Sequence, residues 1–309
     1  EAGKAITTGI ANTILGWQAG SGLQTGHNNV FIGREAGKGV TTTVQNIIAI
    51  GHGSAVGVMT TAANASVFIG ASAGAAVTSG AANVAVGYQA GTNLTDGGNN
   101  VLIGQAANSA GGTSASQNVG IGVNALLNAE GSNNVAIGYA AGDLITTGAQ
   151  NILIGRSTDV SANSGANQTV IGYNATGQGD DTVVLGNSSV TDIYMSEDAG
   201  AKVRCSAIVH TQENVTISSG AITVTSSYVR VLTEGSASSD DLDTINGGVA
   251  GQVLYLQTQF STKDVTLKDM TGNLALAGDF TLDHALDMIH LIYSAADSVW
   301  IEVSRSNNN

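Results

Sequence analysis

The nine residues Asn134-Val-Ala-Ile-Gly-Tyr-Ala-Ala-Gly142 recur almost unchanged at Asn83-Val-Ala-Val-Gly-Tyr-Gln-Ala-Gly91. Both contain a five-residue motif in which Asn is followed by three apolar residues and Gly. Successive motif glycines are 14 to 19 residues apart, and most intervals are 17 or 18. The clear copies begin and end at Asn12 and Gly16, Asn29 and Gly33, Asn83 and Gly87, Asn100 and Gly104, Asn118 and Gly122, Asn134 and Gly138, and Asn151 and Gly155, and weaker copies end at Gly51, Gly70, Gly172 and Gly186.

A period near 17 residues predicts one coil of a β-solenoid, because repeats built from helix pairs need more than about 30 residues. We expect each coil to contain two short strands and two turns. The aliphatic residues favour strand, whereas Asn and Gly favour turns. The absence of proline among 309 residues agrees, since every coil must donate N–H groups to its neighbour. Stacked Asn side chains are expected to form a hydrogen-bonded ladder, and ten steps of about 4.8 Å give a rod of on the order of 50 Å.

The apolar character of all three residues inside the motif predicts a strand that is buried on both faces. The first and third residues point one way and the second points the other, yet the second is also apolar, as at Leu102 and Ala136. One face fills the coil. The other would form an apolar stripe too large for a soluble monomer, so we expect an oligomer around a long axis. Three chains suit a thin two-stranded coil, although these residues leave the number open.

The motif with its Ala-Gly extension, at Asn83–Gly91 and Asn134–Gly142, resembles the head repeat of YadA-type trimeric autotransporter adhesins. Similar repeats occur in phage tail fibres. The resemblance covers about residues 1–190 and implies a left-handed parallel β-roll assembled as a homotrimer. The coil here is longer than in the adhesins. A coiled-coil stalk and an anchor barrel are not recognisable, and the last residues, 304–309, do not end in an aromatic residue. These departures favour a virion fibre.

Composition excludes several classes of protein. The net charge of −13 argues against a nucleic-acid partner, because phosphate binding requires clustered Lys and Arg. No apolar run approaches the ~18 residues of a membrane span, so we expect no membrane insertion. One cysteine, Cys205, forbids an intrachain disulfide. The chain is therefore expected to be an ordered acidic protein built mainly from small and aliphatic residues.

The repeat stops near residue 190, and we expect an all-β second domain after it. The predicted domains are a solenoid shaft of about eleven coils over 1–190, a neck over 191–213 and a tip over 214–309. Short runs with alternating polarity predict an antiparallel, sandwich-like tip. The runs are Tyr228–Leu232, Gln252–Leu256, Asp264–Lys268, Met288–Tyr293 and Val299–Val303, and a helical turn over Asp283–Leu291 is an alternative for one of them.

The tip contains the densest acidic run, and we expect it to be a surface loop between strands. Asp240, Asp241 and Asp243 are therefore candidate receptor contacts, because loops carry much of protein recognition. The run lacks the spacing of an EF-hand calcium loop. We expect no cofactor, since Gly120–Ala125 matches a dinucleotide-binding fingerprint only as part of the repeat.

Metal and catalytic groups are also not expected. Asp283, His284, Asp287 and His290 have no recognised ligand spacing, so no metal site is predicted. The eight acids of residues 1–190 do not recur at matching repeat positions, which argues against the carboxylate pair of a polysaccharide-degrading spike. Threonine runs such as 41–43 and 146–147 look local, which argues against an ice-binding surface.

These observations favour a structural and host-attachment protein that is not an enzyme, most simply a trimeric phage tail fibre. Its expected partners are two further copies of the chain, a cell-surface glycan or protein receptor, and other tail or baseplate proteins at the N-terminal side. The expected location is a virion tail or the extracellular space. A bacterial surface adhesin or an extracellular filament subunit is the alternative, and a polysaccharide-degrading tail spike is a third.

Overall fold

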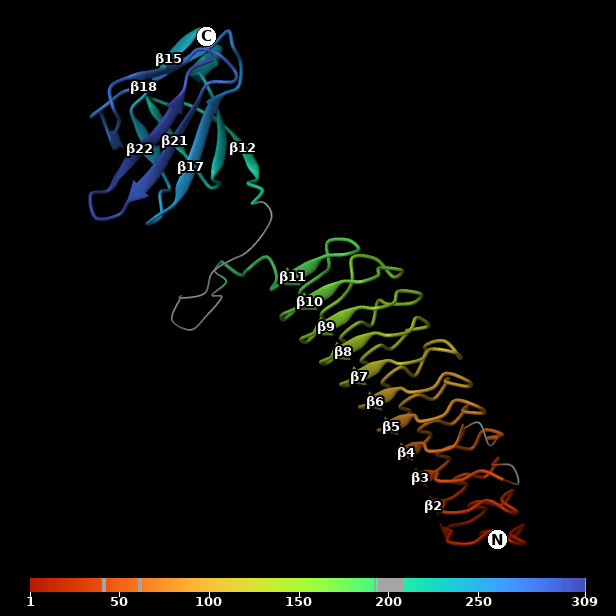
Figure 1. Ribbon diagram of the computed structural model, residues 1–309. Coiled ribbons are helices and arrows are strands. Elements are labelled where there is room, and N and C mark those ends of the chain that lie inside the picture. The colour runs from red at the N-terminus through yellow and green to blue at the C-terminus, as the bar shows by residue number, and fades with distance from the viewer. Residues whose placement is uncertain (41–42, 61–62, 192, 194–207, 309) are drawn as a thin grey trace. The chain divides into compact units, whose positions relative to one another are not determined.

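The computed structural model describes residues 1–40, 43–60, 63–191, 193 and 208–308. The chain is all-β and divides into two compact units, Glu1–Gly200 and Ala201–Asn309 (Figure 1). Most of the predicted neck, and Cys205 with it, lies outside the described residues. None of the helices among these residues has the length and apolar character needed to cross a bilayer.

The first unit is a solenoid with one parallel sheet of eleven strands in chain order (Figure 1). Every strand is three residues long and ends directly before a motif glycine, so the β-solenoid prediction is confirmed. The strands are β1 (Thr13–Leu15), β2 (Val30–Ile32), β3 (Ile48–Ile50), β4 (Val67–Ile69), β5 (Val84–Val86), β6 (Val101–Ile103), β7 (Val119–Ile121), β8 (Val135–Ile137), β9 (Ile152–Ile154), β10 (Thr169–Ile171) and β11 (Val183–Leu185).

The expectation of two strands in each coil was wrong, because the rest of the coil consists mainly of turns. Residues such as Gln89 (φ 59°) and Ala106 (φ 55°) adopt the left-handed conformation, which interrupts an extended backbone. Backbone hydrogen bonds still pass from coil to coil through these turns, as from Ala106 N–H to Tyr88 O (2.8 Å). Isolated pairing such as Asp159 with Thr176 is the remnant of a second strand.

The central residue of each strand points into the coil and forms the core. Phe31, Ala49, Phe68, Ala85 and Leu102 are buried in succession, with relative exposures of 0 to 1%. Large and small side chains alternate along this column, so each large side chain occupies space that a small neighbour leaves free. Further inward side chains follow each glycine at Ala19 and Leu23, Ala36 and Val40, Ala73 and Val77, Ala90 and Leu94, and Ala141 and Ile145.

The predicted asparagine ladder is present and runs beside the sheet. The backbone N–H groups of Asn100, Asn118, Asn134 and Asn151 each donate to the side-chain oxygen of the preceding ladder residue, at 2.8 to 3.1 Å. Their side-chain amides donate to carbonyl groups of the following turn, such as Ala115 O (2.8 Å) from Asn100. The ladder thereby satisfies buried polar groups that an aliphatic side chain would leave unpaired.

The second unit contains a six-stranded sheet, a three-stranded sheet and a two-stranded sheet. The six-stranded sheet has the order β12-β14-β17-β21-β22-β19. Its strands are β12 (Gln212–Thr216), β14 (Tyr228–Leu232), β17 (Val253–Thr258), β19 (Leu274–Ala275), β21 (Met288–Ser294) and β22 (Val299–Ser306). The two-stranded sheet contains β13 (Ala221–Thr223) and β16 (Thr244–Asn246). The three-stranded sheet has the order β15 (Ser239–Leu242), β18 (Asp264–Leu267) and β20 (Phe280–Leu282).

The five tip strands predicted from sequence are confirmed as β14, β17, β18, β21 and β22, and no helical turn replaces β21. The sheets are mixed rather than purely antiparallel. Strands β12, β14 and β17 pair in parallel, whereas β17, β21 and β22 pair antiparallel. The parallel pairs arise because the chain leaves the main sheet after β14 to form η2 (Glu234–Ser236), β15 and β16 before it returns as β17.

The tip has its own hydrophobic core, to which all three sheets contribute. Trp300 is fully buried there, and its indole N–H donates to the carbonyl oxygen of Ile245 (2.9 Å). Its ring contacts that of Tyr293 at 5.1 Å between centroids. A tryptophan whose N–H is satisfied adds a large apolar area to a core without leaving an unpaired donor.

Candidate interaction surface

The first and third residues of strands β1 to β11 point outward and form a surface that we call the apolar stripe. Of its twenty-two residues, twenty are Val, Ile or Leu, and the other two are Thr13 and Thr169. None carries a charge. The side chains align because every strand is in register with its neighbours, as Val101 with Val119 and Ile103 with Ile121.

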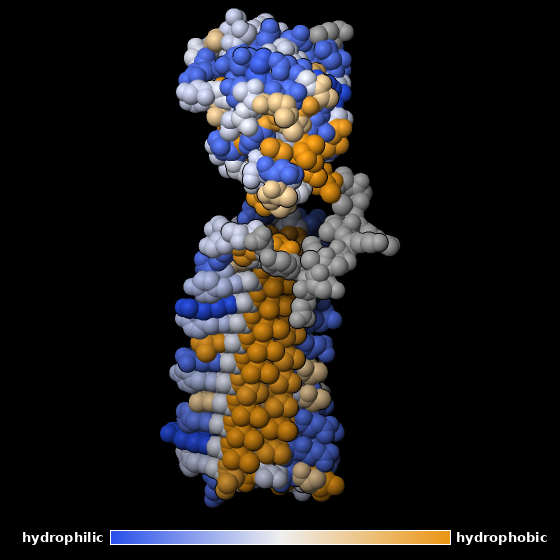
Figure 2. Space-filling view, turned by 90° about the vertical axis from the view of Figure 1, so that its left-hand side faces the viewer, coloured by the Kyte–Doolittle hydropathy of each residue, from blue (hydrophilic) through white to orange (hydrophobic). Residues whose placement is uncertain are grey.

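The apolar stripe is exposed in the single chain along the whole solenoid. It appears as a continuous hydrophobic band bordered on both sides by more hydrophilic columns (Figure 2). Ile103, Ile137 and Ile154 in the middle of the stack are 37 to 38% exposed. Ten steps of about 4.8 Å and a width of about 10 Å give an area of on the order of 500 Å². Contiguous apolar patches of this size mark interaction sites.

A second feature, which we call the post-glycine column, borders the apolar stripe. It consists of the residue directly after each motif glycine, and three of its aromatic members, Tyr88, Tyr139 and Tyr173, are 50 to 62% exposed. In chain order the column contains Trp17, Arg34, His52, Ala71, Tyr88, Gln105, Val123, Tyr139, Arg156, Tyr173 and Asn187.

Cation–π contacts connect members of this column on neighbouring coils. The Arg34 guanidinium lies 5.0 Å from the ring centroid of Trp17. The Arg156 guanidinium lies between Tyr139 (5.5 Å) and Tyr173 (5.8 Å). This column was not recognised from the sequence because its residue types vary. It could have been found from its constant position, one residue after each motif glycine.

The opposite border of the apolar stripe is the pre-strand column, formed by the second residue before each strand. All eleven members have positive φ, between 53° and 63°. Seven are amides and one, Asp181, is acidic. The amides are Asn28, Asn46, Asn99, Gln117, Asn133, Gln150 and Asn167. Asn is enriched in this conformation, since its short polar side chain tolerates it.

The acidic run proposed as a receptor loop is not a loop. Asp240 and Asp241 belong to β15, which pairs with β18, and Asp243 separates β15 from β16. Cross-strand pairing overrides the low strand propensity of Asp. Asp240 accepts a hydrogen bond from the backbone N–H of Glu234 (2.7 Å), so it holds the turn at η2. Asp241 remains exposed on the strand.

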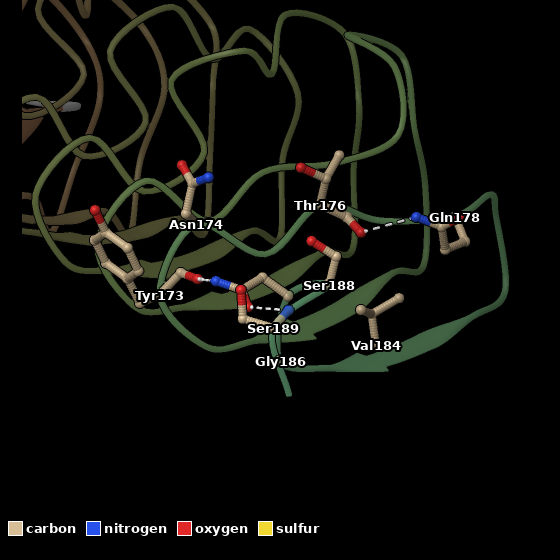
Figure 3. Close-up of a pocket in the computed structure, with 9 residues that line it drawn as sticks. Tyr173, Asn174, Thr176, Gln178, Val184, Gly186, Ser188 and Ser189 are labelled. Carbon is tan, nitrogen blue, oxygen red and sulfur yellow. Dashed lines mark hydrogen bonds between the residues drawn. The ribbon is translucent and has the colours of Figure 1, made fainter. Parts of the chain in front are cut away.

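The C-terminal end of the solenoid has a polar hollow of about 660 Å³ between its last coils (Figure 3). Tyr173, Asn174, Thr176 and Gln178 line it from one coil, and the turn after β11 lines it from the next. The Asn187 side chain donates to the carbonyl oxygen of Tyr173 (2.8 Å) and closes that turn. The described residues that line it are uncharged.

Two carboxylic acids on neighbouring coils meet, although they lie at unmatched positions of the repeat, as expected. The carboxyl groups of Asp159 and Asp143 share a hydrogen bond. Asp159 also accepts from the N–H groups of Leu144 and Val160, both at 3.0 Å. Burial, together with the hydrogen bond and negative charge of Asp143, raises the pKa of Asp159 to about 7. The pair could not be recognised from the sequence because Asp143 lies five residues after its motif glycine, whereas Asp159 lies four residues after its own. The arrangement resembles two acids that share one proton.

In the tip, the acidic and histidine residues considered for a metal do not gather into a site. No group of three or more potential ligands occurs among the described residues. Asp287 is buried and accepts from the N–H groups of Asp283, His284 and Asn308. Although burial alone would raise its pKa, these donors lower the pKa of Asp287 below the ordinary value. His290 instead stacks on Tyr255, with centroids 4.7 Å apart.

Four other threonines form a row over consecutive coils, which the sequence runs did not indicate. The hydroxyls of Thr60, Thr78 and Thr95 each donate to the carbonyl oxygen of the next member, ending at Thr113, at 3.2 to 3.3 Å. Glu130 occupies the next equivalent turn. The hydroxyl donors are used within the coil stack.

Comparison with protein-family models, with curated proteins and with solved structures gives no match for this chain.

Proposed function

We propose that this protein is a subunit of a homotrimeric extracellular fibre, with a phage tail fibre as its setting. The solenoid forms the shaft, and the C-terminal unit binds a glycan or protein on a cell surface. The observation that carries the proposal is the apolar stripe, which contains twenty aliphatic residues and no charge. In the assembly, each chain packs its stripe against those of its two neighbours around a common axis.

The energetics favour association through the apolar stripe. Covering on the order of 500 Å² of apolar surface stabilises the assembly by about 12 kcal/mol per chain. Association costs about 4 to 15 kcal/mol in lost freedom and side-chain ordering. Burial of the stripe alone therefore roughly offsets the free-energy cost of association, and contacts at its borders determine the affinity.

The distribution of charge is compatible with this packing. The chain carries a net charge of −13, but the stripe itself is neutral along its full length. Neighbouring copies can therefore approach without bringing like charges into contact. Exposed acids such as Asp96 and Asp181 lie outside the stripe at solvated positions, where salt screens them.

The role of the C-terminal unit in attachment rests on its independent fold. It has its own core, and it places the exposed carboxylate of Asp241 on β15. Three copies of one weak site on a single fibre act together, because the second and third contacts become intramolecular. Multivalency thus allows firm attachment without a deep pocket in any one tip.

Assembly is tested by light scattering on the purified full chain. We expect a mass near three times 30.8 kDa that persists on dilution to micromolar concentrations. A stable species of one chain would overturn the proposal. Attachment is tested separately by adding the fluorescently labelled protein to a panel of bacterial cells, with capsule-stripped cells as the control. Release of reducing ends from the capsule polysaccharide would show that the protein degrades its receptor, as a tail spike does, rather than only binding it.

A further inference from the structure

The apolar stripe leaves one property of the assembly undetermined, namely the axial register between copies. Its side chains repeat at every coil, since the first and third strand residues are Val, Ile or Leu in nearly all of them. If one copy slid by one coil, about 4.8 Å, it would bury nearly the same aliphatic area. Strands whose pattern repeats in this way are prone to slip unless another feature fixes the register.

The post-glycine column is the part of this surface that does not repeat. Its bulky and charged members occur at unequal intervals. Trp17 and Arg34 form one contact pair, and Tyr139, Arg156 and Tyr173 form a second cluster that begins six coils after Arg34. Between them lie five members of mixed type, of which Tyr88 is the largest: His52, Ala71, Tyr88, Gln105 and Val123. A copy displaced by one coil would place these groups against the wrong partners.

We propose that the post-glycine column sets the axial register of the fibre by packing against the pre-strand column of the adjacent copy. This inference rests on the proposed trimer and identifies the residues that determine its specificity. In a cyclic assembly of three chains the contacts are head-to-tail around the axis, so one border of each stripe meets the opposite border of its neighbour.

The chemistry of the two columns is complementary. The pre-strand column presents seven exposed amides, whose carbonyl oxygens can accept hydrogen bonds from Arg34 and Arg156. With the coils level, Arg34 lies beside Asn28 of the neighbour, whereas a copy displaced by one coil in one direction would place it beside Ala11, which has no side-chain acceptor. Arg, Tyr and Trp are the residues that dominate the energetics of protein interfaces. Both arginines already lie against aromatic rings within their own chain, which restricts their conformations before association.

The dimensions also favour the participation of this column. Extending the stripe by one side-chain row increases the width to about 15 Å and the area to about 750 Å² per chain, close to the ~800 Å² per partner of a stable interface. The apolar stripe alone is smaller than this. The column therefore supplies area as well as register.

Loss of register has a measurable consequence. Three chains in register cover one another's stripes completely and form a closed assembly. Staggered chains leave uncovered stripe at both ends, and each overhang can recruit another copy. Correct register thus corresponds to a single mass, whereas slippage gives an open series of longer particles.

The test is a variant in which all bulky and charged members of the column become Gln, so that the column is nearly uniform. Its substitutions in the full chain are Trp17→Gln, Arg34→Gln, His52→Gln, Tyr88→Gln, Tyr139→Gln, Arg156→Gln and Tyr173→Gln. We expect light scattering to show a broad distribution with an average mass at least two-fold above that of the wild type. Electron microscopy should show particles longer than one shaft. Thermal unfolding and circular dichroism verify that the chain is folded.

A matched variant, Gln105→Ala with Val123→Gln, changes the same column where it lacks the Arg and aromatic clusters, and it should retain the wild-type mass. A uniform-column variant with one discrete trimeric mass would overturn the inference while leaving the trimer intact. A folded monomeric variant would also overturn it, because the column would then supply affinity rather than register. A monomeric wild type would instead refute the proposed fibre, so the two failures are distinguishable.

Discussion

At the residue scale, the motif glycine is the position that permits coils to stack. Gly104 has φ of +136°, a conformation that side chains rarely adopt. A Cβ atom there would overlap the carbonyl oxygen of Gly122 in the next coil. The same geometry occurs in successive coils, so glycine is required both by the backbone angle and by the close approach of the next coil.

We therefore predict that Gly104→Ala destabilises the solenoid by ~3 kcal/mol or more, since it combines backbone strain with overpacking. Gly120→Ala is the matched control. Gly120 is the central residue of β7. A Cβ atom added there would lie 3.4 Å from its nearest neighbours, which is an ordinary van der Waals contact. Its effect should stay within ~1 kcal/mol in either direction. Urea unfolding of both variants measures the difference, and equal destabilisation would contradict the stacking argument.

The Asp143–Asp159 pair makes stability depend on pH at one place in the shaft. The pKa of Asp159 is about 7 in the folded chain against an ordinary 3.8, so the folded state holds this proton more tightly. Stability from this group is therefore greatest near pH 4, falls as the pH rises towards 7, and stays low above it.

We predict that Asp159→Asn raises the unfolding midpoint at pH 8 and leaves it nearly unchanged near pH 4. The amide can still accept from the Leu144 N–H and carries no charge. Asp96→Asn, at an exposed acid of another coil, serves as control and should show no such pH-dependent gain. Thermal or urea unfolding across pH 4 to 8 provides the measurement. A gain of equal size at both pH values would contradict the shared-proton interpretation.

At the scale of elements, the asparagine ladder and the strands form one unit. Asn100 donates through its side chain to Asn83 Oδ1 (3.0 Å) and Ala115 O (2.8 Å), and it accepts from the N–H of Asn118 (3.0 Å). These groups are buried, so removing the amide leaves both a donor and an acceptor unpaired. Each unpaired buried group costs about 1 to 3 kcal/mol.

Asn100→Ala should accordingly destabilise the shaft by ~3 kcal/mol, as measured by urea unfolding. Asn93→Ala is the comparison, because Asn93 is an exposed asparagine of a neighbouring turn. Its effect should remain near ~0.5 kcal/mol. A small effect of Asn100→Ala would mean that water replaces the ladder contacts.

The elements that could be predicted from sequence are those whose side chains determine the backbone locally. The Asn-to-Gly motif located all eleven strands, because its aliphatic residues and its glycine each have one suitable place in a coil. A second strand in each coil could not be excluded, since the left-handed conformation of residues such as Gln89 and Ala106 is imposed by stacking. The strand β15 was missed for a related reason, because its pairing with β18 overrides the turn preference of Asp240 and Asp241.

The candidate surface was only partly predictable. The stripe followed from the apolar first and third residues of each strand. The columns that border it did not, because Arg156 and Tyr139 have no common chemical type to reveal their alignment. A column of unlike residues becomes visible only when the coils are superimposed.

At the scale of the whole molecule, the proposed association would depend on the apolar stripe. Ile137 lies in the middle of it and is 37% exposed in the single chain. Ile137→Asp places a carboxylate where the proposed neighbours pack, and burying an unpaired charge is costly. We predict that this variant is a folded monomer, or a trimer at least 100-fold weaker, by light scattering and sedimentation.

Thr147→Asp introduces the same charge at an exposed turn residue of the coil that follows β8 and should leave the trimer intact. Loss of assembly in both variants would indicate a general effect of charge rather than contact at the stripe. Unchanged assembly of Ile137→Asp would place the interface elsewhere.

The single three-residue strand per coil has a consequence for how such a chain can change in evolution. Each coil contacts mainly the coils before and after it, so one unit of about 17 residues can be duplicated or deleted without redesign of the rest. Every such event alters the reach of the shaft by ~4.8 Å. Recombination between the repeats of the gene can therefore lengthen or shorten the solenoid in steps of one coil.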